Sequence, residues 1–89
     1  MLTPIYQKRF EKDIKKATKR HLDMEKIKFV ILKLLKEEPL PEKNRNHKLK
    51  GEFEGYLECH IEPDWLLIYK KTNTSIIFVR TGTHADLFK

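Results

Sequence analysis

Polar side chains that can transfer protons are concentrated in two short segments in the last third of the chain. His60 and Asp64 belong to the first segment and Arg80 and His84 to the second, while His47 lies in the stretch before them. Imidazoles exchange protons near neutral pH, and a guanidinium can hold a phosphate group that is being displaced. These residue types therefore indicate acid–base chemistry on a phosphate ester.

Each of these residues also has an ordinary structural explanation. A single histidine on the polar face of a strand is most often a surface residue, and Asp64 follows Pro63 as a common turn residue. Arg80, near the end of a strand, could pair with a carboxylate at the rim of the sheet. His84 could belong to a tail that only anchors to the core.

Other chemistries find less support in the sequence. His60 and Asp64 are four residues apart, but an expected turn separates them, and the chain has neither a Cys pair nor a His-x-His motif. We therefore expect no cofactor and no structural metal, and a catalytic metal is a weak alternative. Cys59 is expected to face the core, which disfavours a thiol nucleophile. The sequence has no Gly-rich phosphate loop, which argues against a nucleotide-dependent enzyme.

Strands with a two-residue period would position these side chains. Three are predicted: residues 56–62, 65–70 and 75–81. The alternation places His60 on the polar face of the first strand, away from Cys59. It places Arg80 on the same face as Ile76 and Phe78 in the third strand.

Two amphipathic helices are predicted before the strands. Apolar residues recur at helical spacing in residues 5–20, with many lysines and arginines between them, so the outer face is strongly basic. A second helix is expected to begin at the N-cap Asp23 and to end before Pro39. Phe29 and Leu32 widen its apolar stripe, so we expect it to be covered on two sides. The short break between the helices suggests an antiparallel hairpin.

These elements predict an α+β fold, with two N-terminal helices packed on a mostly antiparallel sheet of three to four strands. The stretch Met1–Pro4 could be the additional strand. A chain of 89 residues suffices for a single domain, which we place at residues 1–89. The single cysteine fits a reducing compartment, and no stretch approaches the ~18 apolar residues that span a membrane, so a cytoplasmic location is expected.

The net charge of +6 is unevenly distributed. Residues 1–50 hold 15 Lys and Arg against 7 Asp and Glu, whereas residues 51–89 hold 4 against 6. A basic face attracts nucleic acid or an acidic protein, and the ordinary alternative is a solvated helix surface. We expect Lys12, Lys15 and Lys16, on the first helix, to bind RNA phosphates.

Three stretches of the chain carry a family likeness: His47–Gly51, then His60-Ile61-Glu62-Pro63-Asp64-Trp65, then Arg80-Thr81-Gly82-Thr83-His84-Ala85-Asp86-Leu87-Phe88. Together they resemble the YafQ branch of the RelE/ParE toxin superfamily. The resemblance extends over residues 5–88 in the order of elements and is strongest from residue 47 onward. The last two stretches are specific only in combination.

The resemblance implies the toxin of a type II toxin–antitoxin pair, a metal-independent endoribonuclease that cleaves mRNA, typically in the ribosomal A site. The implied partners are mRNA, the ribosome and a cognate DNA-binding antitoxin encoded upstream. The toxin would be a monomer on its own and a hetero-oligomer with the antitoxin. Matching positions imply an active site made of His47, His60, Asp64, Arg80, His84 and Phe88.

In that mechanism, His60 and His84 transfer protons, Asp64 orients one of them, and Arg80 stabilises the phosphate. Which histidine is the base stays open. His47 would contact the phosphate or share the proton transfer. Trp65 and Phe88 could stack on a base, which is worth about 1–3 kcal/mol, although core packing is a close alternative for Phe88.

Two functions from other classes remain as alternatives. A ParE-like toxin binds gyrase without cutting RNA, and it has no need of His47, His60 and His84 at these positions. A plain RNA-binding module would bind RNA and leave the phosphodiester intact.

Overall fold

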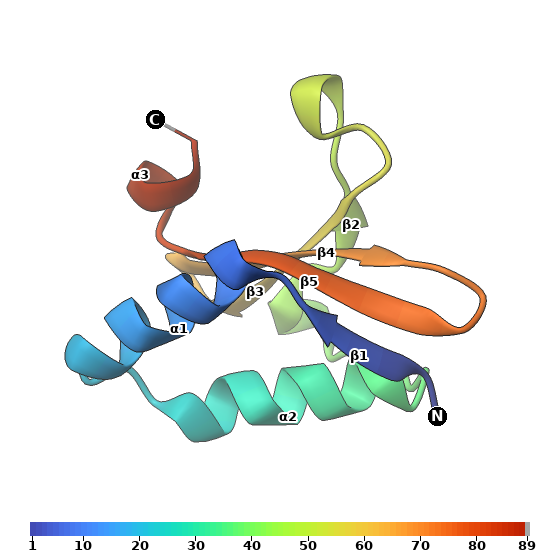
Figure 1. The fold of residues 1–89 in the computed structure, drawn as a ribbon, viewed down its shortest axis with the longest axis horizontal. Coiled ribbons are helices and arrows are strands. Elements are labelled where there is room, and N and C mark those ends of the chain that lie inside the picture. Colours follow the sequence, from blue (N-terminus) through green and yellow to red (C-terminus); the bar gives the residue numbers. More distant parts are fainter. Residues whose placement is uncertain (89) are drawn as a thin grey trace.

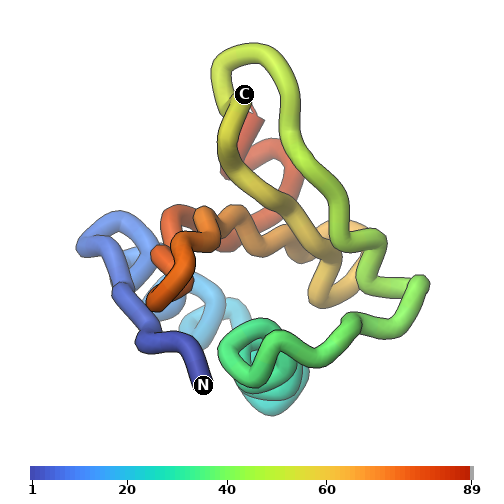
Figure 2. The backbone as a smooth tube through the Cα atoms, turned by 90° about the vertical axis from the view of Figure 1, so that its right-hand side faces the viewer, coloured from blue at the N-terminus to red at the C-terminus, as the bar shows by residue number. Residues whose placement is uncertain are grey.

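The computed structural model describes residues 1–88, in which a five-stranded sheet lies between two unequal layers (Figure 1). Helices α1 and α2 lie on one side of the sheet. Figure 2 shows the loop before β3 and the C-terminal turn rising together on the other side. The elements are β1 (Thr3–Tyr6), α1 (Lys8–Lys19), α2 (Met24–Leu35), the 3₁₀ turn η1 (Glu42–Asn44), β2 (His47–Lys48), the 3₁₀ turn η2 (Gly51–Phe53), β3 (Leu57–Glu62), β4 (Trp65–Lys71), β5 (Ser75–Gly82) and α3 (His84–Leu87). No helix in residues 1–88 has the length and apolar character needed to cross a membrane.

The sheet has five strands rather than the predicted three to four, in the order β1-β5-β4-β3-β2. β1 pairs in parallel with β5, and the other neighbours are antiparallel. β1 runs through Pro4 to Tyr6 instead of ending at Pro4, and every residue in it is exposed. The sequence does not reveal the extent of β1, because an exposed edge strand has no alternating pattern and its parallel partner lies near the other end of the chain. β2 is only two residues long, so no sequence period reveals it.

The helices largely follow the apolar periodicity. α1 begins at Lys8 because the two apolar residues before it belong to β1, and α1 buries Phe10 and Ala17. α2 begins after Asp23, whose carboxylate accepts a hydrogen bond from the Glu25 N–H at 3.0 Å. The predicted N-cap is therefore confirmed.

The prediction that α2 is covered on two sides is wrong. Phe29 is 49% exposed and Leu32 46% exposed, so both face away from the sheet. The buried side of α2 is formed instead by Ile27, Val30 and Leu34. A chain of this size has too few elements to cover the second side of the helix.

β4 is buried on both faces, so the domain has two apolar clusters. Leu66, Leu67 and Ile68 are each 0% exposed. Leu67 belongs to the larger cluster between sheet and helices. Leu66 and Ile68 pack under Leu87 of α3 on the opposite face. The small second cluster fixes α3 to the sheet.

A β-bulge in β5 decides which face Arg80 occupies. Ile68 of β4 lies opposite Arg80, whereas the next residue, Tyr69, lies opposite Phe78, so Val79 is the additional residue. A bulge inverts the alternation of side chains beyond it. The prediction that Arg80 shares a face with Phe78 is therefore wrong, because Arg80 joins the face of Ile68 instead.

Candidate active site

Three histidines meet on the face of the sheet opposite α1 and α2. His47 of β2 lies opposite Glu58 of β3 in the register, His60 is two residues further along β3, and His84 is the first residue of α3. The ring centroids of His47 and His60 are 6.3 Å apart, and those of His60 and His84 are 5.9 Å apart. The fold thus forms a row of imidazoles from three separate elements.

A carboxylate that the sequence analysis did not single out lies between two of these rings. Glu58 Oε1 is 3.4 Å from His47 Nε2 and 3.6 Å from His60 Nε2. Glu58 is only 5% exposed. The other ring nitrogen of His47, Nδ1, donates to the carbonyl of Arg45 at 2.6 Å. Glu58 therefore places a negative charge where the imidazoles carry positive charge during proton transfer.

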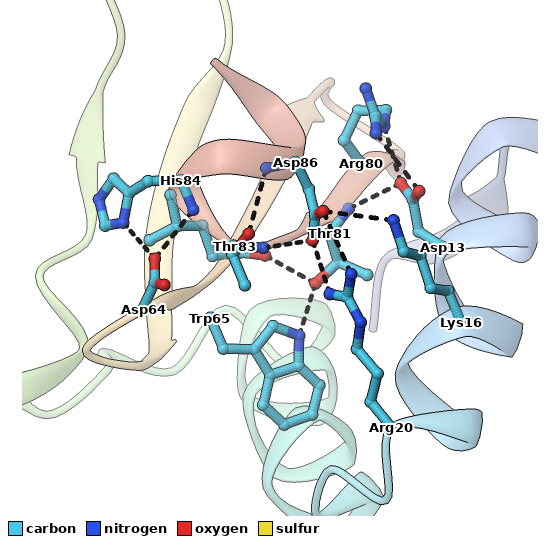
Figure 3. A network of polar contacts seen from close by, with 11 residues as sticks. Asp13, Lys16, Arg20, Asp64, Trp65, Arg80, Thr81, Thr83, His84 and Asp86 are labelled. Carbon is cyan, nitrogen blue, oxygen red and sulfur yellow. Dashed lines mark hydrogen bonds and ion pairs between the residues drawn. The ribbon is translucent and has the colours of Figure 1, made fainter. Parts of the chain in front are cut away.

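At the other end of the row, Asp64 accepts two hydrogen bonds from His84 (Figure 3). The backbone N–H of His84 donates at 2.9 Å, and its ring Nδ1 donates at 2.6 Å. These hydrogen bonds, the backbone one first, hold the pKa of Asp64 below its usual value of 3.8. The pair fixes the ring so that Nε2 points away from Asp64, which is the geometry that an orienting carboxylate requires.

His60, in the middle of the row, is the least exposed of the three histidines. Its side chain is 12% exposed, compared with 48% for His47 and 55% for His84. Burial lowers the pKa of His60 from its ordinary 6.5, and the negative charge of Glu58 partly opposes this shift. A lowered pKa keeps the imidazole neutral at physiological pH, the form that accepts a proton.

Arg80 does not contact the histidines in this structure. Its Nε donates to Asp13 of α1 at 2.7 Å, and Asp13 also accepts from the Thr81 N–H at 3.1 Å (Figure 3). The register aligns Arg80, Ile68 and Glu58 in one row across β5, β4 and β3. Adjacent strands are about 4.8 Å apart, so the backbone of Arg80 lies about two such spacings from Glu58. Arg80 is thus on the histidine face, held by Asp13.

A second acidic residue outside the predicted site, Asp86, ties α3 to α1 (Figure 3). Asp86 accepts hydrogen bonds from Arg20 Nη1 at 2.8 Å and Lys16 Nζ at 3.3 Å. It also forms a capping box with Thr83, whose N–H donates to it at 2.9 Å. The Arg20 contact, followed by the Thr83 N–H, holds the pKa of Asp86 well below its usual range. Since α3 begins at His84, this network positions that ring.

The sequence contained a partial signal for these missed residues. Thr83-x-x-Asp86 has the spacing of a capping box, and Glu58 lies on the same strand face as His60. The contact of Asp86 with α1 and the burial of Glu58 depend on tertiary pairing, which sequence spacing does not report.

The prediction that Trp65 stacks on a base is wrong. Trp65 is 2% exposed, and its Nε1 donates to Thr81 Oγ1 at 3.0 Å on the helix-covered face. Phe88, in contrast to Trp65, is exposed to solvent. It is 41% exposed, and its ring meets the ring of Phe53 edge-on at 5.5 Å. Phe88 therefore presents an accessible aromatic surface on the side of α3, outside the main core.

The three lysines predicted to bind phosphate are exposed on α1, but they are not equivalent. Lys16 is ion-paired with Asp86, so it contributes to the network that holds α3. Lys12 and Lys15 form no ion pair with the described residues. The prediction for these three lysines therefore remains open, with a structural contact added for Lys16.

Neither a reactive thiol nor a metal cluster is present among the described residues. Cys59 is 0% exposed, and burial, with the nearby charge of Glu58, raises its pKa to about 12. Within residues 1–88, no three His, Cys, Asp or Glu side chains are arranged to hold a metal ion.

Comparison with known proteins relates this geometry to a family. The family described as "Bacterial toxin of type II toxin-antitoxin system, YafQ" matches residues 2–89. The mRNA interferase toxin YafQ of Escherichia coli K12 is 48% identical over 84 residues, which cover 93% of this chain and 91% of that protein. A crystal structure of the E. coli DinJ–YafQ complex matches with a TM-score of 0.93 at 44% identity, covering 100% of both chains. A metal-bound toxin from Helicobacter pylori matches with a TM-score of 0.93 at 38% identity, covering 99% of this chain and 100% of that one. The chain therefore belongs to the YafQ family of bacterial toxins of type II toxin–antitoxin systems.

Proposed function

We propose that residues 1–89 act as one toxin domain, an endoribonuclease that cleaves mRNA on the ribosome without a metal ion. The E. coli relative at 48% identity is named an mRNA interferase toxin. The observation that carries the proposal is the row of His47, His60 and His84, with Asp64 hydrogen-bonded to the last ring at 2.6 Å. A gyrase binder or a plain RNA-binding module has no use for such a row.

RNA carries its own nucleophile, the 2′-hydroxyl. Cleavage requires a base for that proton, positive charge for the phosphorane-like transition state, and an acid for the departing 5′-oxygen. We assign the base to His60, because burial lowers its pKa and favours the neutral ring. We assign the acid to His84, because Asp64 aims its Nε2 and stabilises positive charge on the ring. The products are a 2′,3′-cyclic phosphate and a 5′-hydroxyl.

The remaining residues support the phosphate and the base. Arg80 supplies a fixed guanidinium, with Asp13 holding one side of it at 2.7 Å. His47 contacts the phosphate or shares the proton transfer, and Glu58 Oε1 lies 3.4 Å from its Nε2. Phe88, with its exposed ring, stacks on a nucleobase.

The partners follow from the same relatives. The E. coli YafQ relative crystallised in a complex with DinJ. We infer that a cognate antitoxin, DNA-binding and encoded upstream, holds this chain in a hetero-oligomer, and that the free toxin is a monomer. Its action on messages and ribosomes would place it in the cytoplasm.

Metal independence is a separate part of the proposal, because a related toxin from H. pylori is described as metal-bound. A base, an acid and a cation suffice for 2′-hydroxyl attack. Cleavage of free RNA, where it occurs, should therefore persist in EDTA. Loss of that activity in EDTA and its return with added zinc or copper would contradict metal independence.

The main experiment maps the ends left on a message that is translated in a purified system. The wild type should leave 2′,3′-cyclic or 3′-phosphate ends. Substitutions His60→Ala and His84→Ala should each slow cleavage by about 10²–10⁴-fold, the usual cost of losing an acid–base group. Arg80→Ala should also slow it. Full activity in both histidine variants would contradict the assignment.

The control is His21→Asn, which changes a histidine in the connection between α1 and α2, directly after the C-cap of α1. His21 has a left-handed backbone with φ of 61°, which asparagine tolerates. This variant should cleave like the wild type. RNA that the wild type binds but leaves intact would instead favour a plain binding module.

A further inference from the structure

A small aromatic patch lies beside the histidine row. It consists of Phe53 in η2, Tyr56 directly before β3, and Phe88 directly after α3. The ring centroid of Phe53 is 5.5 Å from that of Phe88 and 6.3 Å from that of Tyr56. Tyr56 also packs with Ile68 and Leu87 in the second apolar cluster. Phe53 is thus the residue that connects the loop before β3 to the C-terminal turn.

The register of the sheet places this patch on the side of the histidines, away from α1 and α2. Ile68, which packs with Tyr56, lies opposite both Glu58 and Arg80 in the sheet. Glu58 contacts two of the histidines, and Arg80 is the candidate phosphate ligand. The patch therefore adjoins the row of side chains that would perform the chemistry.

The two segments that meet at the patch also carry the outer histidines. His47 lies in β2, before the loop, and His84 opens α3. η2 and α3 rise from the same side of the sheet (Figure 1, Figure 2). The Phe88 N–H donates to the His84 carbonyl at 2.8 Å, so these two residues are about one helical turn, roughly 5.4 Å, apart along the axis. A nucleotide beside a phosphate held at His84 is therefore within reach of the patch.

The loop fixes Phe53 through its own backbone. The Leu49 N–H donates to the Tyr56 carbonyl at 2.9 Å, and the Tyr56 N–H donates to the Phe53 carbonyl at 3.0 Å. Gly51 and Gly55 have φ of 70° and 94°, a conformation that other residues rarely adopt. A Cβ at either glycine would meet no atom within 4 Å, so the glycines serve the path of the loop rather than close packing.

The rings of Phe53 and Phe88 form a corner. Their planes are inclined at 87°, so a flat group that stacks on one ring meets the other ring edge-on. Nucleobases of every type stack on aromatic side chains, and edge-on contacts between rings are also favourable. Phe88 is 41% exposed and Phe53 is partly exposed, so solvent reaches the corner.

The charges around the patch favour the base of a nucleotide at Phe53 and its phosphate elsewhere. Glu52 and Glu54 flank Phe53 and are exposed, so this loop repels phosphate groups. On the other side of the patch, Lys70 Nζ lies 5.8 Å from the centroid of the Tyr56 ring. Lys70 is exposed and forms no ion pair within residues 1–88.

We propose that Phe53 is a base-binding residue, and that the nucleobase next to the scissile phosphate stacks in the corner between the Phe53 and Phe88 rings, with its other phosphate near Lys70. The proposal rests on the endoribonuclease function and deepens it, because it adds a second ring to the stacking contact of Phe88. It accounts for a phenylalanine held between two carboxylates on a loop with glycine at both ends.

The first test compares Phe53→Ala with Phe29→Ala. Phe29 is a matched control, because it is 49% exposed on α2 and lies on the other side of the sheet. Phe53→Ala should raise KM for ribosome-bound message by about 10-fold, the size of a lost base–aromatic contact, with kcat nearly unchanged. Phe29→Ala should match the wild type. An unchanged KM in Phe53→Ala, or an equal rise in both variants, would overturn the proposal.

Two further variants separate base binding from packing of α3. Phe53→Leu keeps an apolar side chain against Phe88 but has no aromatic face, so its KM should rise as much as in Phe53→Ala. Phe53→Trp restores an aromatic face and should return KM to near the wild-type value. Wild-type KM in Phe53→Leu, or a loss confined to kcat, would assign Phe53 to packing and overturn the proposal.

The third test removes the base instead of the ring. A message with an abasic ribonucleotide at one of the two positions flanking the cut should lose as much in KM as Phe53→Leu does. The two losses should not add, because both remove the same contact. Additive losses, or no loss at either flanking position, would overturn the proposal.

A binding measurement separates failure of the base-binding site from failure of the nuclease function. The probe is a message with a 2′-O-methyl group at the cut, bound on the ribosome by wild-type protein and by Phe53→Leu. Weaker binding in Phe53→Leu supports the base-binding site even if wild-type protein cuts nothing, a result that would contradict the nuclease function alone. Unchanged binding of this probe together with weaker binding of the purified antitoxin would overturn the proposal and assign the patch to a protein interface.

Discussion

At the residue scale, His60 and Glu58 oppose each other in setting the proton affinity of the proposed base. Burial lowers the pKa of His60 from 6.5, and the Glu58 carboxylate, 3.6 Å from its Nε2, raises it part of the way back. The base works only when neutral, so its activity is lost as the pH falls through this pKa. The acidic limb of the pH–rate profile should therefore lie below pH 6.5.

Replacing Glu58 tests this balance. Glu58→Gln removes the negative charge that raises the pKa of His60, so the acidic limb of kcat/KM should move to lower pH. The measurement is the ratio of variant to wild-type rate across pH, in which the titration of the ribosome cancels.

The control for that experiment is Glu52→Gln, which removes the same charge from an exposed residue of η2. The acidic limb of the pH–rate profile of Glu52→Gln should coincide with that of the wild type. A limb that moves to higher pH in Glu58→Gln would show that His60 is not the base.

At the element scale, α3 is four residues long and depends on its surroundings. A single helical turn is unstable on its own, because its nucleation is not repaid by further hydrogen bonds. Leu87 packs on β4, Thr83 and Asp86 cap the turn, and Arg20 and Lys16 hold Asp86 from α1. The position of the proposed acid is thus set partly by a helix at the other end of the chain.

We predict that Arg20→Gln lowers kcat by about 10-fold while the thermal midpoint changes little. Small displacements of a catalytic group are costly in rate. The ion pair with Asp86 is partly exposed, and solvent-exposed ion pairs contribute little to stability. Activity and thermal unfolding are measured on the same preparations.

Lys19→Gln is the matched control, because it removes a charge from the same end of α1 without contacting Asp86. It should retain wild-type kcat. Amide exchange in residues 83–88 should accelerate only in Arg20→Gln. Equal rates of cleavage and exchange in the two variants would contradict the positioning role.

At the scale of the whole molecule, the basic helix α1 and the candidate active site are connected by direct contacts, which the sequence does not show. α1 carries 6 of the 19 Lys and Arg residues, and the same end of the chain contacts the site through Asp13, Lys16 and the C-cap Arg20. A test of phosphate binding that reverses Lys16 would also disturb α3. Lysines without an ion pair are the ones whose reversal tests phosphate binding without also disturbing α3.

We predict that the reversal of Lys8, Lys12 and Lys15 to Glu weakens ribosome binding and flattens its salt dependence. Each phosphate contact that is lost should reduce the slope of log affinity against log salt by about one unit. Slow cleavage of free RNA should change little. Binding is measured at low and moderate salt.

The same reversals at Lys28 and Lys33 of α2 and at its C-cap Lys36 give an identical change in net charge. They should affect ribosome binding much less if α1 makes the specific contacts. Equal losses in the two triple variants would show that only net charge matters, and unaltered binding in the α1 variant would favour a solvated or antitoxin-binding helix.

Features that depend on neighbouring residues could be predicted from the amino-acid sequence. Helical and two-residue periods located α1, α2 and β3 to β5, and they placed His60 on the face away from Cys59. Asp23 and the capping-box spacing of Thr83 mark helix starts in the same local way. The resemblance of the motifs to the YafQ branch was confirmed by the family match.

Features that depend on pairing between distant segments could not be predicted and required the three-dimensional structure. β1 exists as a strand because β5 lies beside it, and the bulge at Val79 moves Arg80 to the histidine face. The same pairing buries Trp65 and encloses Glu58 between two imidazoles. The alternation of a strand reports two faces, but it does not tell which face is covered or where the register shifts. The spacing of residues therefore identified the candidate catalytic side chains, and the register of the sheet set their positions relative to one another.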